Sequence, residues 1–144
     1  MLLSGLALSG ANRRVAPGSP VDADDDGILT AEEIASLDLS GVEWVVLSAC
    51  QTGIGRIQAG EGVLGLRRAF RVAGARTLIM SLWRVEDEAA REWMKRLYKS
   101  RLSGLSTADA VRQASLSVLR DRRRSGGTTH PFYWGAFVAD GDWR

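Results

Sequence analysis

A cysteine stands at the end of an apolar run and just before glycines, an arrangement that could present a nucleophilic thiol. Residues 45–55 read V-V-L-S-A-C-Q-T-G-I-G, with Cys50 after the apolar residues and Gly53 close behind it. Backbone N–H groups of a glycine-containing turn can point at a developing oxyanion, because glycine allows close approach. Cys50 is therefore a candidate nucleophile and Gly53 a candidate member of the oxyanion loop. A free cysteine is also often a buried, inert residue, so the motif alone leaves both roles open.

A thiol nucleophile needs a base, and the chain has a single histidine, His130. Without a base, a thiol of pKa about 8.5 is only a few per cent thiolate at pH 7. The residues that follow His130 are P-F-Y-W, which is a setting for a structural histidine at the start of a strand. We therefore expect His130 not to be the base of Cys50.

The composition indicates one globular domain of 144 residues, with 45% hydrophobic and 25% charged residues. One cysteine excludes an internal disulfide and fits the cytoplasm. A membrane partner is not expected, because no stretch is apolar and long enough to span a bilayer. Nucleic acid is not expected either, since the net charge is only +2 and the basic run Arg120–Arg124 lacks interleaved aromatic residues.

The pattern of apolar residues predicts alternating strands and helices. Strands are expected at residues 2–8, 42–49, 77–82 and 132–139, and helices at 30–37, 63–73, 87–102 and from Ser106 onward. Such alternation is typical of an α/β fold with a mostly parallel sheet and helices on both faces. Residues 42–49 are expected to be a central strand buried on both faces. Cys50 would then stand at a carboxyl end of the sheet, where such folds bind ligands.

Local signals indicate where the helices begin and which faces they bury. Thr30 with Glu33, and Ser106 with Asp109, have the spacing of capping boxes. The expected buried sets are Ala90, Trp93, Met94, Leu97 and Tyr98 in one helix and Ala108, Val111, Ala114 and Val118 in the next. Residues 120–129 are expected to form a solvated turn.

An acidic loop insertion at about residues 15–29 has the spacing of a calcium loop. Within D-A-D-D-D-G-I-L-T-A-E-E, residues 22–33, the oxygen ligands would be Asp22, Asp24, Asp26 and Glu33. No entering helix is expected, because prolines precede the loop. The alternative is that the loop is simply solvated and that no cofactor is bound.

Six blocks of the sequence resemble the CHAT domain, a caspase-like family of cysteine peptidases and their relatives, related in fold to caspases and separase. They are S-G-L-A-L-S-G-A-N (4–12), D-G-I-L-T-A-E-E-I (26–34), L-S-A-C-Q-T-G (47–53), G-E-G-V-L-G-L-R-R-A-F (60–70), S-L-W-R-V-E-D (81–87) and H-P-F-Y-W-G-A-F (130–137). The resemblance implies a caspase-like three-layer α/β/α sandwich with Cys50 as nucleophile. It places the base on a His-Gly strand motif upstream of residue 4, so residues 1–144 are expected to be the C-terminal part of one CHAT domain, incomplete at its N-terminal side.

The resemblance also implies a function for the parent protein: a cysteine endopeptidase of bacterial signalling or defence, acting on a protein or peptide substrate. Tetratricopeptide repeats or other sensor domains are expected upstream. Glu61 and Asp87 are candidates for an acidic pocket that takes a basic P1 residue, although each could equally be an acid favoured at a helix start. The chain alone is expected to have little or no peptidase activity. The alternatives are a catalytically inactive interaction or scaffold domain and a calcium-responsive binding module.

Overall fold

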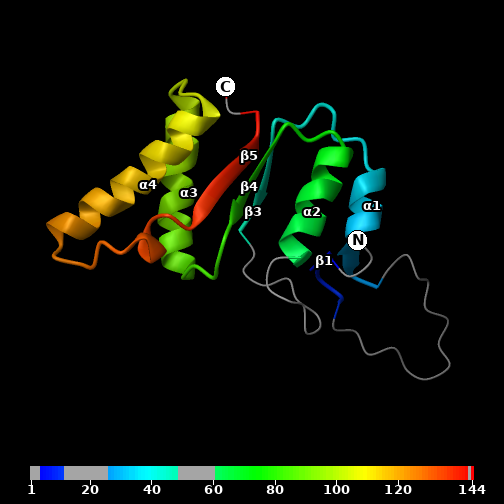
Figure 1. The fold of residues 1–144 in the computed structure, drawn as a ribbon, viewed down its shortest axis with the longest axis horizontal. Helices are drawn as coiled ribbons and strands as arrows, with labels where there is room; N and C mark the ends of the chain where they lie inside the picture. Colours follow the sequence, from blue (N-terminus) through cyan, green and yellow to red (C-terminus); the bar gives the residue numbers. More distant parts are fainter. Residues whose placement is uncertain (1–3, 12–25, 49–60, 143) are drawn as a thin grey trace. The chain divides into compact units, whose positions relative to one another are not determined.

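The computed structural model describes residues 4–11, 26–48, 61–142 and 144, apart from the side chains of residues 61–64. The chain forms two compact units (Figure 1). The first unit consists of Met1–Gly41 and Thr52–Ala75, and the second unit consists of Val42–Gln51 and Arg76–Arg144. Helices and strands occur in both units, so the chain belongs to the α/β class.

The first unit contains a two-stranded antiparallel sheet and two helices that pack together. Strand β1 (Gly5–Ala7) pairs with β2 (Ile28–Thr30), and helices α1 (Ala31–Ser36) and α2 (Glu61–Val72) follow. The buried residues of these helices are Ala31, Ile34, Leu66, Ala69 and Phe70. The helices expected at residues 30–37 and 63–73 are thus confirmed, with small shifts of their ends.

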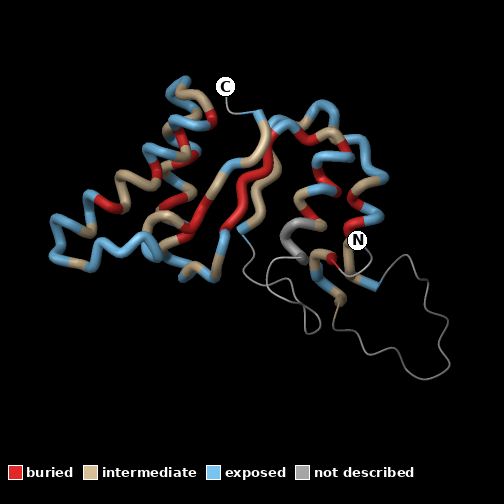
Figure 2. The backbone as a smooth tube through the Cα atoms, in the orientation of Figure 1, coloured by how far each residue is buried: buried red, intermediate tan, exposed pale blue. Residues whose placement is uncertain are grey.

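The second unit contains a three-stranded mixed sheet in the order β3–β4–β5. Strand β3 (Trp44–Leu47) runs parallel to β4 (Thr77–Ser81), and β5 (Phe137–Gly141) runs antiparallel to β4. All five residues of β4 are buried, as Figure 2 shows, whereas those of β3 are half-buried. The expectation of a mostly parallel sheet with residues 42–49 at its centre was therefore wrong for the described residues, since β4 is the middle strand and β5 reverses direction.

Helices α3 (Asp87–Leu102) and α4 (Thr107–Arg124) pack against this sheet and close its core. The core cluster consists of Ile79, Ala90, Trp93, Leu97, Ala110, Ala114, Ala136 and Phe137. The Trp93 ring stacks on Phe137 with centroids 4.3 Å apart, and its Nε1 donates a hydrogen bond of 3.1 Å to Ser115 Oγ. The indole is thus buried with its polar atom satisfied, as a stable core requires.

The structure corrects two of the expected helix faces and one expected turn. Tyr98 on α3 is 46% exposed. On α4, Ala108 is exposed and Thr107 and Ala110 are buried in its place, whereas Ala114 is buried as expected. Residues up to Arg124 are helical rather than a solvated turn, since arginine is a good helix former and cations suit a helix C-terminus. No helix in the described part of the chain is both long and apolar enough to cross a membrane.

The end of the chain also differs from the expected strand at residues 132–139. Pro131–Tyr133 form a short 3₁₀ helix, and β5 begins only at Phe137. Proline lacks the N–H group that a sheet ladder needs and favours the first position of a helix, which explains why β5 begins later in the chain than expected.

The two leucines of α3 provide a matched test of the core. Leu97 is 0% exposed and Leu102 is 87% exposed. We expect Leu97→Ala to lower the free energy of unfolding by about 2–5 kcal/mol, through lost burial and a cavity, and Leu102→Ala to change it by less than about 0.5 kcal/mol. Urea denaturation followed by tryptophan fluorescence measures both. Equal effects of the two substitutions would contradict the assignment of Leu97 to the core and of Leu102 to the surface.

Candidate functional site

Three chain segments meet at one edge of the second unit's sheet. The last parallel pair is Leu47 with Met80, and Ser81 pairs with Phe137, the first residue of β5. Ser48, which is exposed, is the last described residue before the cysteine motif. Cys50 and Gly53 lie outside the described residues. The register therefore fixes the strand that leads into the motif, and its direction places the carboxyl ends of β3 and β4 at the same edge.

Ser81 ends β4 at this edge with its hydroxyl unsatisfied. The residue is only 9% exposed, and its buried Oγ has no hydrogen-bond partner among the described residues. A buried hydroxyl without a partner costs about 1–3 kcal/mol. Ser81 was not among the site residues predicted from the sequence, because a missing hydrogen-bond partner becomes apparent only when the neighbouring residues are placed.

The acidic residues proposed for a substrate pocket begin two different helices. Asp87 is the first residue of α3 and is exposed, as is the N-cap residue Glu86, whose side chain makes no capping hydrogen bond. Glu61 is the first residue of α2, and its side chain lies outside the described residues. Asp87 sits where a carboxylate stabilises the positive end of the helix dipole. An acidic pocket formed by Glu61 and Asp87 stays a prediction.

His130 caps the 3₁₀ helix that precedes β5. Its Nδ1 accepts a hydrogen bond of 3.2 Å from the backbone N–H of Phe132. In a neutral imidazole the accepting nitrogen carries no proton, so we assign the proton to Nε2. The turn is held further by Trp83, which stacks on Phe132 at 5.7 Å and donates from Nε1 to the Phe132 carbonyl at 3.0 Å. Nδ1 of His130 is therefore engaged in a structural contact.

The end of the acidic loop is stabilised by local hydrogen bonds. Asp26 Oδ1 accepts from the N–H of Ile28 at 2.7 Å. Gly27 has φ of +73°, and an added Cβ would lie 2.3 Å from the nitrogen of Ala11, so only glycine fits there. Asp22 and Asp24 lie outside the described residues. Within residues 4–11, 26–48, 61–142 and 144, no group of three or more acidic, histidine or cysteine side chains could hold a metal ion. The calcium site stays a prediction.

Glu33 forms the capping box expected from the sequence. Its Oε2 accepts hydrogen bonds from the N–H of Thr30 at 2.7 Å and from Thr30 Oγ1 at 2.8 Å, and Thr30 Oγ1 accepts from the N–H of Glu33 at 3.2 Å. These bonds to the carboxylate lower the pKa of Glu33 below its ordinary value. One oxygen of the proposed calcium ligand is thus already engaged at the start of α1.

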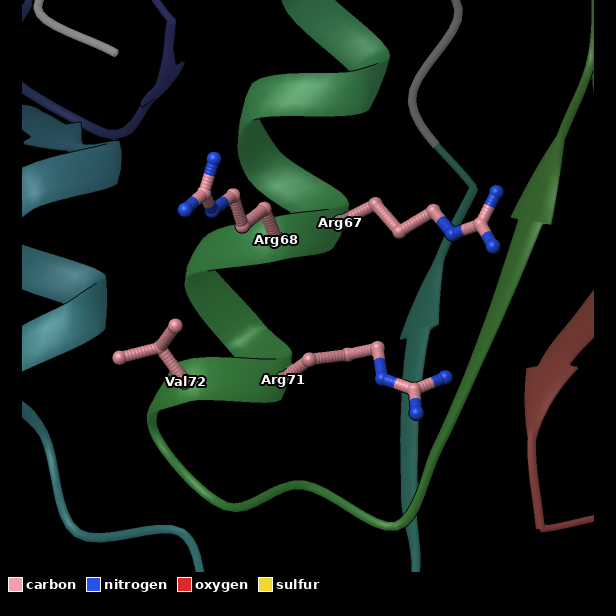
Figure 3. Close-up of a pocket in the computed structure, with 4 residues that line it drawn as sticks. All are labelled: Arg67, Arg68, Arg71 and Val72. Atoms are coloured by element: carbon pink, nitrogen blue, oxygen red, sulfur yellow. The ribbon is translucent and has the colours of Figure 1, made fainter.

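A hollow of about 730 Å³ beside α2 is lined by Arg67, Arg68, Arg71 and Val72 (Figure 3). Arg67 and Arg71, four residues apart, extend to one side of the helix, and Arg68 and Val72 extend to the other. None of the described residues that line this hollow is acidic.

Titration with calcium tests the acidic loop directly. If the loop binds calcium, we expect saturable heat for the chain, loss of that heat in Asp24→Ala, and retention in Asp25→Ala, because Asp25 occupies a loop position that does not supply a ligand. Isothermal titration calorimetry provides the measurement. Identical heats for the chain and Asp24→Ala would remove the calcium site.

The capping box predicts a pH dependence of stability. Because the folded pKa of Glu33 is lowered, the carboxylate stabilises α1 above the ordinary pKa of 4.5, and this contribution is lost as the pH falls through the lower folded value. The difference in free energy of unfolding between the chain and Glu33→Gln should therefore shrink as the pH is lowered below 4.5. A difference that stays constant through this range would contradict the charged cap.

Comparison with known proteins agrees with the motifs. The sequence model of the CHAT domain matches residues 1–142. Tetratricopeptide repeat protein 28 of Mus musculus is 35% identical over 114 residues, and its Homo sapiens counterpart is 34% identical over 114 residues. Each match covers 79% of this chain but 4% of the relative, so the chain spans a small part of these proteins. Both relatives are mammalian, and the expected bacterial setting stays a prediction. The chain belongs to the CHAT domain family.

Proposed function

We propose that the chain carries the nucleophile of a caspase-like cysteine endopeptidase, with Cys50 as the attacking residue. The observation that best supports this proposal is the parallel pairing of β3 with β4, because Ser48, two residues before Cys50 in the sequence, follows β3 at the carboxyl ends of these strands. Membership of the CHAT family and the unsatisfied hydroxyl of Ser81 at the same edge support it.

The proposed reaction is acyl transfer to sulfur. The Cys50 thiolate attacks the scissile carbonyl carbon, and backbone N–H groups near Gly53 stabilise the oxyanion that forms. Collapse of this intermediate breaks the C–N bond, and the leaving amine takes a proton from the conjugate acid of the base. Water then hydrolyses the thioester and releases the second product.

The base is proposed to come from outside this chain. His130 is not proposed as the base, because its Nδ1 accepts a hydrogen bond from the N–H of Phe132. General-base catalysis contributes about 10²–10⁴-fold to the rate, so the chain alone should be slower than a complete site by that factor.

The surroundings of the site follow from the same proposal. We propose that the complete fold is a three-layer α/β/α sandwich. The substrate would be a protein or peptide whose basic P1 residue binds beside Glu61 and Asp87. The relatives are named for tetratricopeptide repeats, which supports such repeats in the parent protein. A single cysteine without a disulfide partner supports a cytoplasmic setting.

Hydrolysis of a fluorogenic peptide with arginine at P1 tests the proposal, with and without added imidazole as a substitute base. We expect almost no hydrolysis by the chain alone and a saturable increase with imidazole. Cys50→Ala should abolish that increase because it removes the nucleophile, and His130→Ala should leave it unchanged because His130 is a structural cap.

The controls separate the alternatives. Hydrolysis that persists in Cys50→Ala would refute the role of Cys50. Failure of imidazole to raise hydrolysis, with the cysteine intact and the chain folded, would favour the inactive interaction domain instead.

A further inference from the structure

A charged groove lies between helices α3 and α4 of the second unit, and its lining includes none of the residues assigned to the proposed reaction. We define the α3–α4 groove by its lining residues, which are Arg96, Lys99, Ser100, Ser117, Arg120, Asp121 and Arg124. Its volume is about 380 Å³. Helices α3 and α4 pack against each other, and α4 runs obliquely to α3 in the view of Figure 1.

Only one carboxylate lines the groove against four cations. Asp121 Oδ2 lies 2.7 Å from Arg96 Nη2, and its Oδ1 lies 3.6 Å from Arg124 Nη1. Within the described part of the chain, Lys99 and Arg120 have no ion-pair partner. The lining therefore carries a net positive charge of three, which attracts an anion.

Other cations of α3 are neutralised, so the groove is not a general property of the helix. Arg91 pairs with Glu88 at 2.5 Å, and Lys95 pairs with Glu92 at 2.8 Å. Arg101 contacts Glu43. Among the cations of α3, only Lys99 has no carboxylate partner in the described part of the chain.

Two half-buried hydroxyl groups also line the groove. The side chains of Ser100 and Ser117 make no hydrogen bond to any described residue. A serine hydroxyl in a helix commonly donates a hydrogen bond to a backbone carbonyl of the preceding turn. Here two hydroxyls without such a bond lie beside two cations without an ion-pair partner in the described part of the chain. Each hydroxyl can donate to an oxygen atom that the cations hold in place.

We propose that the α3–α4 groove binds a phosphoryl group, with Lys99 and Arg120 as the charged donors and Ser100 and Ser117 as the neutral donors. A phosphoryl group offers several oxygens and about two negative charges, which match two cations and two hydroxyls better than a single carboxylate does. The groove volume is many times the roughly 30 Å³ of one water molecule, so part of the molecule that bears the phosphoryl group also fits.

The site is separate from the cysteine motif. Helix α3 begins after the carboxyl end of β4 and runs back along the sheet, so Lys99 and Ser100 lie in its C-terminal half, away from the edge that leads to Cys50. The proposal therefore does not depend on peptidase activity, and it holds equally for an inactive domain.

Calorimetric titration of the whole chain with sodium pyrophosphate at low ionic strength tests the site. We expect saturable binding that weakens about tenfold in Lys99→Ala and about tenfold in Arg120→Ala, because each removes a charge-assisted hydrogen bond. Lys99→Arg should retain binding. Arg112→Ala is the matched control, since this exposed cation lies on α4 outside the groove and its loss changes the net charge equally.

Further titrations separate the source of the phosphoryl group. Tighter binding of pyrophosphate than of O-phosphoserine would indicate a free phosphate compound, and the reverse order would indicate a modified side chain. Absence of saturable binding for both, or an equal loss in Arg112→Ala and in the groove variants, would overturn the proposal, because the charge would then act only as a diffuse surface. Circular dichroism of each variant confirms that the helices are intact.

Discussion

The second unit depends on the burial of β4 between two strands of opposite direction. Its five residues are all buried, and its backbone groups can be satisfied only by pairing with β3 and β5. At the start of the strand, Gly141 has φ of +132°, and an added Cβ would lie 2.1 Å from the carbonyl oxygen of Arg76, so the approach of β5 requires glycine. Thr77 Oγ1 donates to the Asp142 carbonyl at 2.7 Å and fixes the same end. This register determines which chain segments meet at the opposite edge.

The features that the sequence predicted best are local ones. The capping box of Thr30 and Glu33 and the start of α4 after Ser106 depend on residues within one turn of each other, so their spacing is sufficient evidence. The direction of β5 was not predictable in this way, because the choice between parallel and antiparallel pairing depends on contacts far apart in the chain. The buried face of α4 was predicted only in part: Ala114 is buried as expected, but Ala110 rather than Ala108 faces the core, which depends on how α4 packs against α3.

The same difference between local features and features set by distant contacts applies to the candidate site. The prediction of Cys50 rests on its motif alone, an apolar run followed by a cysteine and a glycine, and Cys50 lies outside the described residues. Ser81 and the α3–α4 groove were not predictable from a motif, since each is defined by what surrounds it. An unsatisfied hydroxyl is visible only when its neighbours are placed, and Lys99 and Arg120 become one charged surface only when two helices bring them together.

We propose that the carboxyl ends of β3 and β4 form a surface that recognises a peptide at Cys50, rather than merely exposing a reactive thiol. The most direct measurement compares the rate at which Cys50 is labelled by a thiol-reactive group carried on an arginyl peptide with the rate for the same group without the peptide. The account predicts that this ratio of rates is higher for the folded chain than for the chain unfolded in urea. An identical ratio in the two states would contradict it, because Cys50 would then react as an ordinary thiol.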